Sequence, residues 1–162
     1  MRIYRIPLPA TAVTVQVDLT ELLQAASQMV KLTEIRFGQT TDLGDAQEEQ
    51  ISVSLVTGHA TSGSGGNTGV VPLGDPGDPT YGGTVDSFNT TLASTGTTVT
   101  KLLGMWNVRT EFLWIPVPKG ETPAGLWLPY STTLFNVVRL GAAPADSITI
   151  SGYVEIGVVG AA

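Results

Sequence analysis

The sequence of 162 residues contains no cysteine and a single histidine. Without cysteine there is neither a disulfide framework nor a thiolate nucleophile or metal ligand. Charged residues make up only 14% of the chain, and the eight basic ones are scattered along it. The net charge of −6 sets a surface that repels phosphate backbones, so we predict no binding of nucleic acid.

Long apolar runs are also missing. The N-terminal segment carries Arg2 and Arg5, but Pro7 and Pro9 interrupt it before an apolar stretch can form. No segment approaches the roughly 20 apolar residues that a membrane-spanning helix needs. We therefore expect a protein that is soluble where it is made and does not associate with membranes.

The sequence does contain a persistent two-residue alternation of apolar and polar side chains. It is clearest in residues 147–156, where isoleucine and valine recur at every second position except Gly152. It returns in residues 13–19, 51–55 and 134–140. This period is typical of strands with one buried face. We predict an all-β fold, a single β-sandwich domain over residues 1–162 with about eight to ten strands.

The strand and breaker patterns predict the strand boundaries. A first strand ends at Pro7 and Pro9, and a second begins near Ala12. In the second, Asp18 to Glu21 resembles a helix capping box, so a helical turn is the alternative to a strand that runs to about Leu23. The predicted strands cover residues 2–6, 12–23, 30–38, 49–57, 84–91, 97–103, 109–117, 125–129, 132–140 and 147–159.

Between residues 57 and 83 the alternation stops. Glycine, serine and proline dominate this segment, and proline cannot donate a ladder hydrogen bond. We predict one long Gly/Pro-rich surface loop, a length at which loops are usually functional or mobile.

Few residues offer catalytic chemistry. His59 is the one side chain suited to be a base near neutral pH, and its position at the start of the Gly/Ser segment favours an exposed loop histidine. Ser62 or Ser64 as a nucleophile would need a rigid elbow, whereas Ser-Gly repeats supply flexibility. No lysine follows the glycines at 63–66, which argues against a phosphate site. We predict no enzymatic activity and no cofactor.

Acidic residues gather in residues 42–49 and at Asp75 and Asp78. Carboxylates are suitable ligands for Ca²⁺, but the spacing of a calcium-binding loop is missing. Solvated turns between strands are the favoured interpretation, and no metal site is predicted.

The aromatic residues of the C-terminal half allow two interpretations. Trp106, Trp114, Trp127 and Tyr130 could form a platform that stacks on sugar rings. Alternatively, Trp114 packs in the core or at a subunit interface, where tryptophan is enriched. The second interpretation is favoured.

Three segments carry a resemblance to known proteins: residues 38–49, 62–66 and 136–146. They resemble segments of small virion proteins of tailed phages and prophages. The size, the acidity and the β pattern are also similar to head decoration, or cement, proteins. That resemblance implies a jelly-roll sandwich made in the host cytoplasm. It would sit on the outer capsid surface of the virion as a homo-oligomer, favoured as a trimer, and stabilise the major capsid protein. No catalytic residue is implied.

The candidate capsid or subunit contacts are Arg2, Tyr4, Arg5, Trp114, Trp127 and Tyr130. Residues 1–9 either form the first strand of the chain's own sheet or act as an arm that adds to a neighbour's sheet edge. The alternative function is a glycan-binding module of a phage fibre or adhesin, which would use the aromatic residues and the 57–83 loop.

Overall fold

The computed structural model describes residues 1–41, 49–118 and 125–160. Within these ranges the fold is built from strands, and the all-β prediction is confirmed. No helical segment in the described part of the chain has the length and apolar character that a membrane crossing requires. The ten strands are β1 (Arg2–Val13), β2 (Asp18–Leu23), β3 (Gln28–Gln39), β4 (Gln50–His59), β5 (Thr84–Asn89), β6 (Val99–Asn107), β7 (Phe112–Trp114), β8 (Leu126–Trp127), β9 (Phe135–Leu140) and β10 (Ile148–Gly160).

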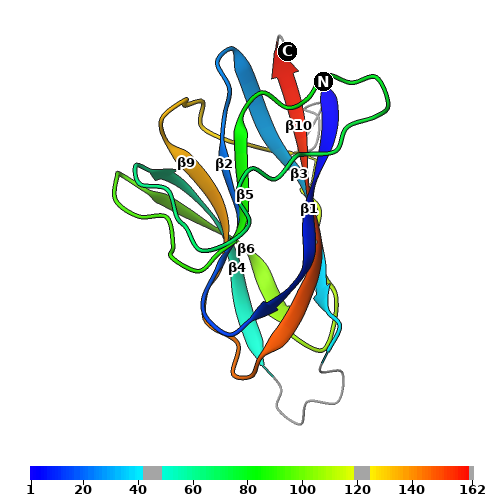
Figure 1. The fold of residues 1–162 in the computed structure, drawn as a ribbon, viewed down its shortest axis with the longest axis vertical. Coiled ribbons are helices and arrows are strands. Elements are labelled where there is room, and N and C mark those ends of the chain that lie inside the picture. The colour runs from blue at the N-terminus through cyan, green and yellow to red at the C-terminus, as the bar shows by residue number, and fades with distance from the viewer. Residues whose placement is uncertain (42–48, 119–124, 161–162) are drawn as a thin grey trace.

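The strands form two antiparallel sheets that face each other (Figure 1). Sheet A has the order β1-β10-β3-β7, with β8 also paired to β3, and sheet B has the order β5-β2-β9-β4-β6. The pairs are nested along the chain: β1 pairs with β10, β2 with β9, β3 with β7 and β8, and β4 with β6. The predicted β-sandwich is therefore correct at the level of two stacked sheets.

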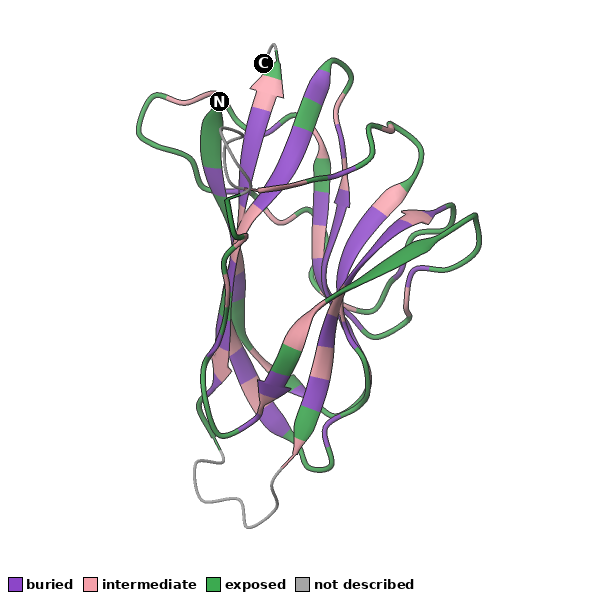
Figure 2. Ribbon diagram, turned by 180° about the vertical axis from the view of Figure 1, so that it is seen from behind, coloured by how far each residue is buried: buried purple, intermediate pink, exposed green. Residues whose placement is uncertain are grey.

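The core lies between the sheets and follows the alternation of the sequence. In β10, Ile148, Ile150, Val154 and Ile156 are all at most 2% exposed, while the polar residues between them face outward. Figure 2 shows buried residues recurring along both sheets. Burial of each such side chain stabilises the fold by about 1.5–3 kcal/mol, which explains why the alternation runs through most of the strands.

Aromatic rings close one end of this core. The ring of Phe37 lies edge-on to Trp106, with centroids 4.9 Å apart, and stacks with Phe112 at 5.1 Å. Trp106 is 1% exposed, and its indole N–H donates to the carbonyl of Thr110 at 2.8 Å. Trp106 is therefore a core residue and takes no part in a row of exposed rings.

The N-terminal strand is longer than predicted. β1 continues through Pro7 and Pro9 to Val13, with a register irregularity between Leu8 and Thr11. Proline is tolerated because β1 is the edge strand of sheet A and the irregularity relieves the ladder. Residues 1–9 thus pair within the chain's own sheet. Residues 14–17 form a connection instead of strand, and the helical alternative near Leu19 does not form.

Candidate functional site

Residues 60–73, here called the strap, belong to the connection between β4 and β5. They run along one side of the sandwich, from the edge of sheet B to the edge of sheet A. The strap makes backbone hydrogen bonds at every third residue. Thr61 and Ser64 pair with Ser94 and Thr91, Asn67 pairs with Ser87, and Val70 donates to Val85. Leu73 then exchanges two bonds of 2.8 Å with Arg5 of β1. The strap therefore follows the free edge of β5 and crosses to the free edge of β1.

The glycines of the strap allow it to lie close to the neighbouring backbone. A Cβ atom on Gly66 would stand 2.2 Å from the carbonyl oxygen of Ser87, and one on Gly63 would stand 2.5 Å from that of Thr91. Gly65 has a φ of +84°, and its Cβ would collide with the Thr90 hydroxyl at 2.3 Å. The flexibility inferred from the Ser-Gly repeat is therefore wrong for this segment, because the glycines serve close packing.

A buried polar cluster on the outer face of sheet B anchors the segment that the strap pairs with. Asp18 is fully buried and accepts two hydrogen bonds from Arg139, at 2.5 and 3.1 Å. Asp18 also accepts from the Ala93 amide at 2.8 Å, and Arg139 donates to the Ala93 carbonyl at 2.8 Å. The Asp18–Arg139 ion pair therefore forms hydrogen bonds with both the amide and the carbonyl group of Ala93.

Glu21 anchors the strap itself. This carboxylate is 3% exposed and accepts hydrogen bonds from the Ser62 hydroxyl at 2.5 Å, the Gly63 amide at 2.7 Å and the Asn89 side chain at 3.4 Å. Buried charges are tolerated only when they are paired or well hydrogen-bonded, and both acids meet that condition. Ser62, considered above as a nucleophile, acts here as a donor to a carboxylate.

The backbone of β2 explains why Asp18 and Glu21 share a face. In a regular strand, residues three apart point to opposite sides of the sheet. The register with β9 shifts between Asp18 and Thr20, which reverses the alternation, so that Leu19 and Leu22 both reach the core. The sequence carries a signal for this cluster, since charged residues stand inside apolar strands at positions 18, 21 and 139.

His59 lies beside this cluster, and the expectation of an exposed loop histidine is wrong. It is the last residue of β4, pairs with Phe135 and is 5% exposed. Neither ring nitrogen makes a hydrogen bond to the described residues. Burial lowers the pKa of His59, the charge of Arg139 lowers it further, and the charges of Asp18 and Glu21 oppose this effect. Burial therefore favours the neutral form of the imidazole.

The acidic segments do not assemble a metal site among the described residues, where no group of three ligating side chains is found. Residues 42–48 lie outside the described part. Glu49 accepts two hydrogen bonds of 3.0 Å from the Ala145 amide. The amide of Asp78 donates to the carbonyl of Asp75 at 2.9 Å, so these two acids form a turn.

The three predicted N-terminal contact residues differ in exposure. Arg2 and Arg5 are exposed and form ion pairs with Asp78 at 3.5 Å and with Glu155 at 3.1 Å. Tyr4 is only 3% exposed, and its hydroxyl donates to the carbonyl of Pro79 at 2.8 Å. Tyr4 therefore fixes the connection that follows the strap and packs in the chain's own core.

The three predicted aromatic contacts lie apart from Trp106. Trp114 is half-buried and pairs with Ile35 at the edge of sheet A. Trp127 is 42% exposed, and its ring faces the ammonium group of Lys31 at 5.3 Å. Tyr130 is 55% exposed and accepts a hydrogen bond from the Ser27 amide. Trp127 and Tyr130 thus keep surface available for a partner.

The side of the sandwich opposite the strap is left open. β6 ends the strand order of sheet B, and eight of its nine residues are exposed or half-exposed, the exception being Trp106 (Figure 2). Three of these exposed residues are large and apolar, at 53–64% exposure: Val99, Leu102 and Met105. We call them the β6 patch. An uncovered apolar edge strand is a template for pairing with another chain.

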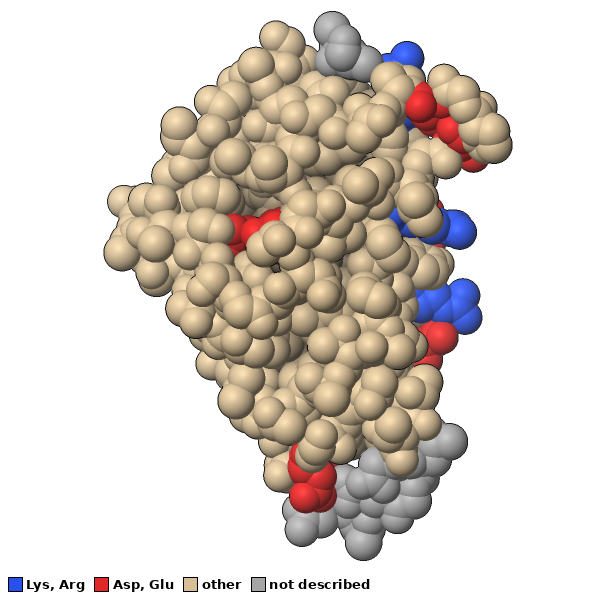
Figure 3. All heavy atoms as spheres, viewed as in Figure 1, with Lys and Arg blue, Asp and Glu red and all other residues tan. Residues whose placement is uncertain are grey.

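Charge is gathered on the outer face of sheet A. Arg5 pairs with Glu155, Tyr153 donates to Glu34 and Arg36 pairs with Glu111 at 2.9 Å. In Figure 3 the visible Lys and Arg atoms lie along the side where β1 runs in Figure 1. Because both arginines face a carboxylate, most of the charge on this face is balanced.

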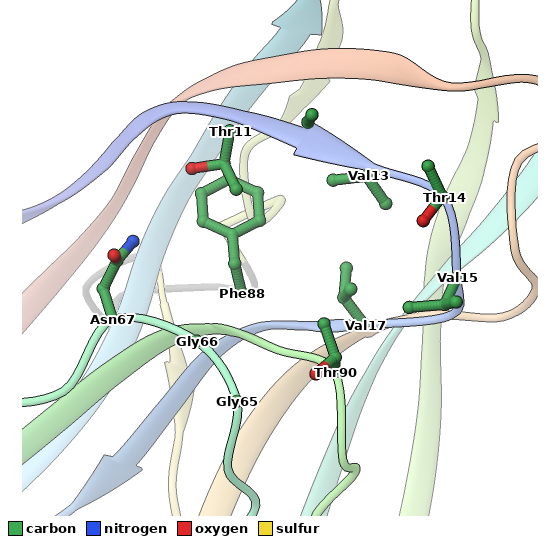
Figure 4. Close-up of a pocket in the computed structure, with 11 residues that line it drawn as sticks. Thr11, Val13, Thr14, Val15, Val17, Gly65, Gly66, Asn67, Phe88 and Thr90 are labelled. Carbon is green, nitrogen blue, oxygen red and sulfur yellow. The ribbon is translucent and has the colours of Figure 1, made fainter.

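A pocket of about 240 Å³ opens between the β1–β2 connection and the strap (Figure 4). Its buried floor consists of Val13, Val17 and Phe88, and Thr11, Thr14 and Thr90 contribute hydroxyl groups. Among the residues that the structure describes, no charged side chain lines it. The pocket suits a small neutral molecule better than an ion.

Comparisons of the chain with protein-family models, with curated proteins and with solved structures find no match.

Proposed function

We propose that this chain is a structural virion protein, a capsid decoration protein that binds the major capsid protein on the outer surface of a phage head as an oligomer. The observation that carries the proposal is the strap. Two buried carboxylates and an arginine fix the strap, a surface segment without charged residues, and the segments beside it. The strap in turn covers the edges of β5 and β1. Such a design favours a rigid binding surface over a chemical site.

The strand order supports a jelly roll as the finer description of the sandwich. Nested pairing of β1 with β10, β2 with β9 and β4 with β6 is what results when one long hairpin is rolled, with alternate pairs in opposite sheets. β5 is an addition to this plan, since it extends sheet B beyond β2. Double-sheet jelly rolls are frequent in capsid-associated proteins.

A decoration protein gains affinity by contacting several capsid subunits at once, and an oligomer multiplies those contacts. The exposed Arg2, Arg5, Trp127 and Tyr130 side chains are candidates for such contacts. Each contact can be weak, because avidity raises the overall affinity by orders of magnitude.

The test is to purify virions of the phage or prophage that encodes the chain and to search them for it by mass spectrometry. The chain is expected in the particle, and the purified protein should bind capsid shells stripped of it. Intact particles that lack the chain would rule out a virion role.

Glycan binding is the second candidate, and the neutral pocket of Figure 4 with the exposed Trp127 ring favours it. A glycan array tests it directly. Specific hits that disappear in Trp127→Ala or Thr90→Val, with stability retained, would support a glycan-binding module over a decoration protein.

A further inference from the structure

His59 lies in a second, thin layer of buried residues on the outer face of sheet B. Three apolar residues form this layer: Val56 of β4, Val137 of β9 and Ala93. The register pairs Val56 with Val137 and His59 with Phe135. Because residues two apart on a strand share a face, His59 points to the same outer face as Val137. The imidazole is therefore buried outside the main core.

Two segments without charged residues lie against this face: residues 60–66 of the strap and residues 90–97, here together called the flap. Paired backbone hydrogen bonds of 2.9–3.0 Å join the two segments, between Thr61 and Ser94 and between Ser64 and Thr91. The flap also contacts the backbone next to His59. A Cβ atom on Gly58 would stand only 2.4 Å from the carbonyl oxygen of Thr97. Water can therefore reach the imidazole freely only when the flap moves.

The charged groups on this face already have partners. Asp18 and Arg139 bond to each other, Glu21 accepts three hydrogen bonds, and Asp86, opposite Glu21 in the β2–β5 register, accepts one from the strap. Neither ring nitrogen of His59 is hydrogen-bonded to the described residues. Burial is the first cause of the lowered pKa of His59, ahead of the charge of Arg139, and the two outweigh the carboxylates of Asp18 and Glu21. A proton on the closed site would add a second buried cation without an acceptor.

Opening the flap disrupts much less packing than unfolding the sandwich. The outer layer contains Val56, Ala93 and Val137, whereas the large aliphatic and aromatic side chains lie in the core between the sheets. Local openings cost least where few apolar contacts are broken. Water can replace the hydrogen bonds that Glu21 and Arg139 make to the flap. The flap can therefore open while both sheets remain folded.

We propose that His59 is an acid-sensitive switch, and that a proton on its ring opens the flap while the two sheets stay folded. The open form binds the proton more readily than the closed form, so opening becomes easier as the pH falls below about 6.5, where a solvated histidine titrates. Opening removes Gly65, Gly66 and Thr90 from the wall of the pocket in Figure 4, so acid also dismantles that pocket. The switch is a property of the single chain and does not depend on the proposed function.

Hydrogen exchange of backbone amides, corrected for the intrinsic effect of pH, tests the switch on the intact chain. The amides of Ser64 and Thr91 report on the flap, and those of β10 report on the sheets. At pH 7.5 the flap amides should exchange at least about tenfold faster than those of β10 and depend less on urea, because a local opening exposes little surface. At pH 5.5 the opening constant of the flap should be about threefold to tenfold larger. Equal opening constants and equal urea dependence at the flap and β10 would overturn the proposal, because the flap would then open only on global unfolding.

His59→Gln is the matched variant, because glutamine is neutral and of similar size. The acid effect on Ser64 and Thr91 should disappear in it, and an effect that persists would assign the switch to another group. A second measurement needs no variant. His59 is the one histidine of the chain, so its ring signal in NMR spectra is unambiguous. The ring should titrate below its usual pH, with flap exchange rising as it does. A ring that titrates near pH 6.5 while the flap stays closed would overturn the proposal.

Discussion

The two sides of the sandwich differ in whether their edge strands are covered. On one side the strap covers the edges of β1 and β5, and a buried ion pair and a second carboxylate hold it there. On the other side β6 ends the sheet with Val99, Leu102 and Met105 exposed to solvent. An open apolar edge strand can pair with another chain, so the two sides differ in the surface that they offer to a partner.

The largest expected effect comes from breaking the covered side at its buried ion pair. Arg139→Ala leaves the fully buried Asp18 without its cation, and this should lower the free energy of unfolding by about 3–5 kcal/mol. Arg36→Ala, which breaks the exposed pair with Glu111, should lower the free energy of unfolding far less, because surface ion pairs contribute little. Urea unfolding measures both. Similar losses in the two variants would contradict the anchoring role of the cluster.

A smaller effect is expected from Gly66→Ala, which forces a methyl group against the Ser87 carbonyl. Displacement of the strap should cost about 1–3 kcal/mol and speed hydrogen exchange at the Ser87 amide. Gly38→Ala is the control, because its nearest atom would be 3.7 Å from the new methyl group. Unchanged exchange at Ser87 in Gly66→Ala would mean that the strap adjusts at no cost.

The pH dependence of the covered side comes from His59. Its pKa is lowered in the folded chain, so below about pH 6.5 the unfolded chain binds a proton that the folded chain resists. Stability should therefore fall as the pH drops below that value and be fully present above it. Urea unfolding at pH 5 and pH 8, repeated on His59→Gln, isolates this contribution from the carboxylates. An identical pH profile in the variant would exclude His59 as its source.

The smallest effect on stability belongs to the open side. Leu102→Ser should change the free energy of unfolding of the monomer by no more than about 0.5 kcal/mol, since the side chain is 64% exposed. Unfolding under dilute conditions, where assembly does not contribute, measures this. A large loss would mean that Leu102 packs within its own chain, and the contrast between the two sides would disappear.

Much of the fold could be predicted from periodicity. The alternation in residues 147–156 predicts β10, whose inward residues are buried as expected. The continuation of β1 through Pro7 and Pro9 could not be predicted, because proline is excluded from central strands and tolerated at edges. Whether a strand lies at an edge is a property of the assembled sheet.

The candidate site was harder to predict. His59 and Glu21 are far apart along the chain, and nothing local indicates that the first is buried and that the second accepts hydrogen bonds from the strap. Gly63 and Gly66 read as flexible because their close contacts, with Thr91 and Ser87, are distant in sequence. The proposed contacts at Arg2, Arg5, Trp127 and Tyr130 remain predictions that the virion and glycan experiments test.

The sequence by itself determined that this chain folds as two stacked sheets, because a two-residue period can bury its apolar side chains only on one face of a strand. It also determined the net charge of −6 and, because the sequence contains no cysteine, the absence of thiol chemistry. Only the tertiary structure decided which edges are covered and which charges are buried. Those outcomes depend on residues such as Asp18 and Arg139 meeting across 121 positions of chain, and local patterns carry no record of such long-range pairing.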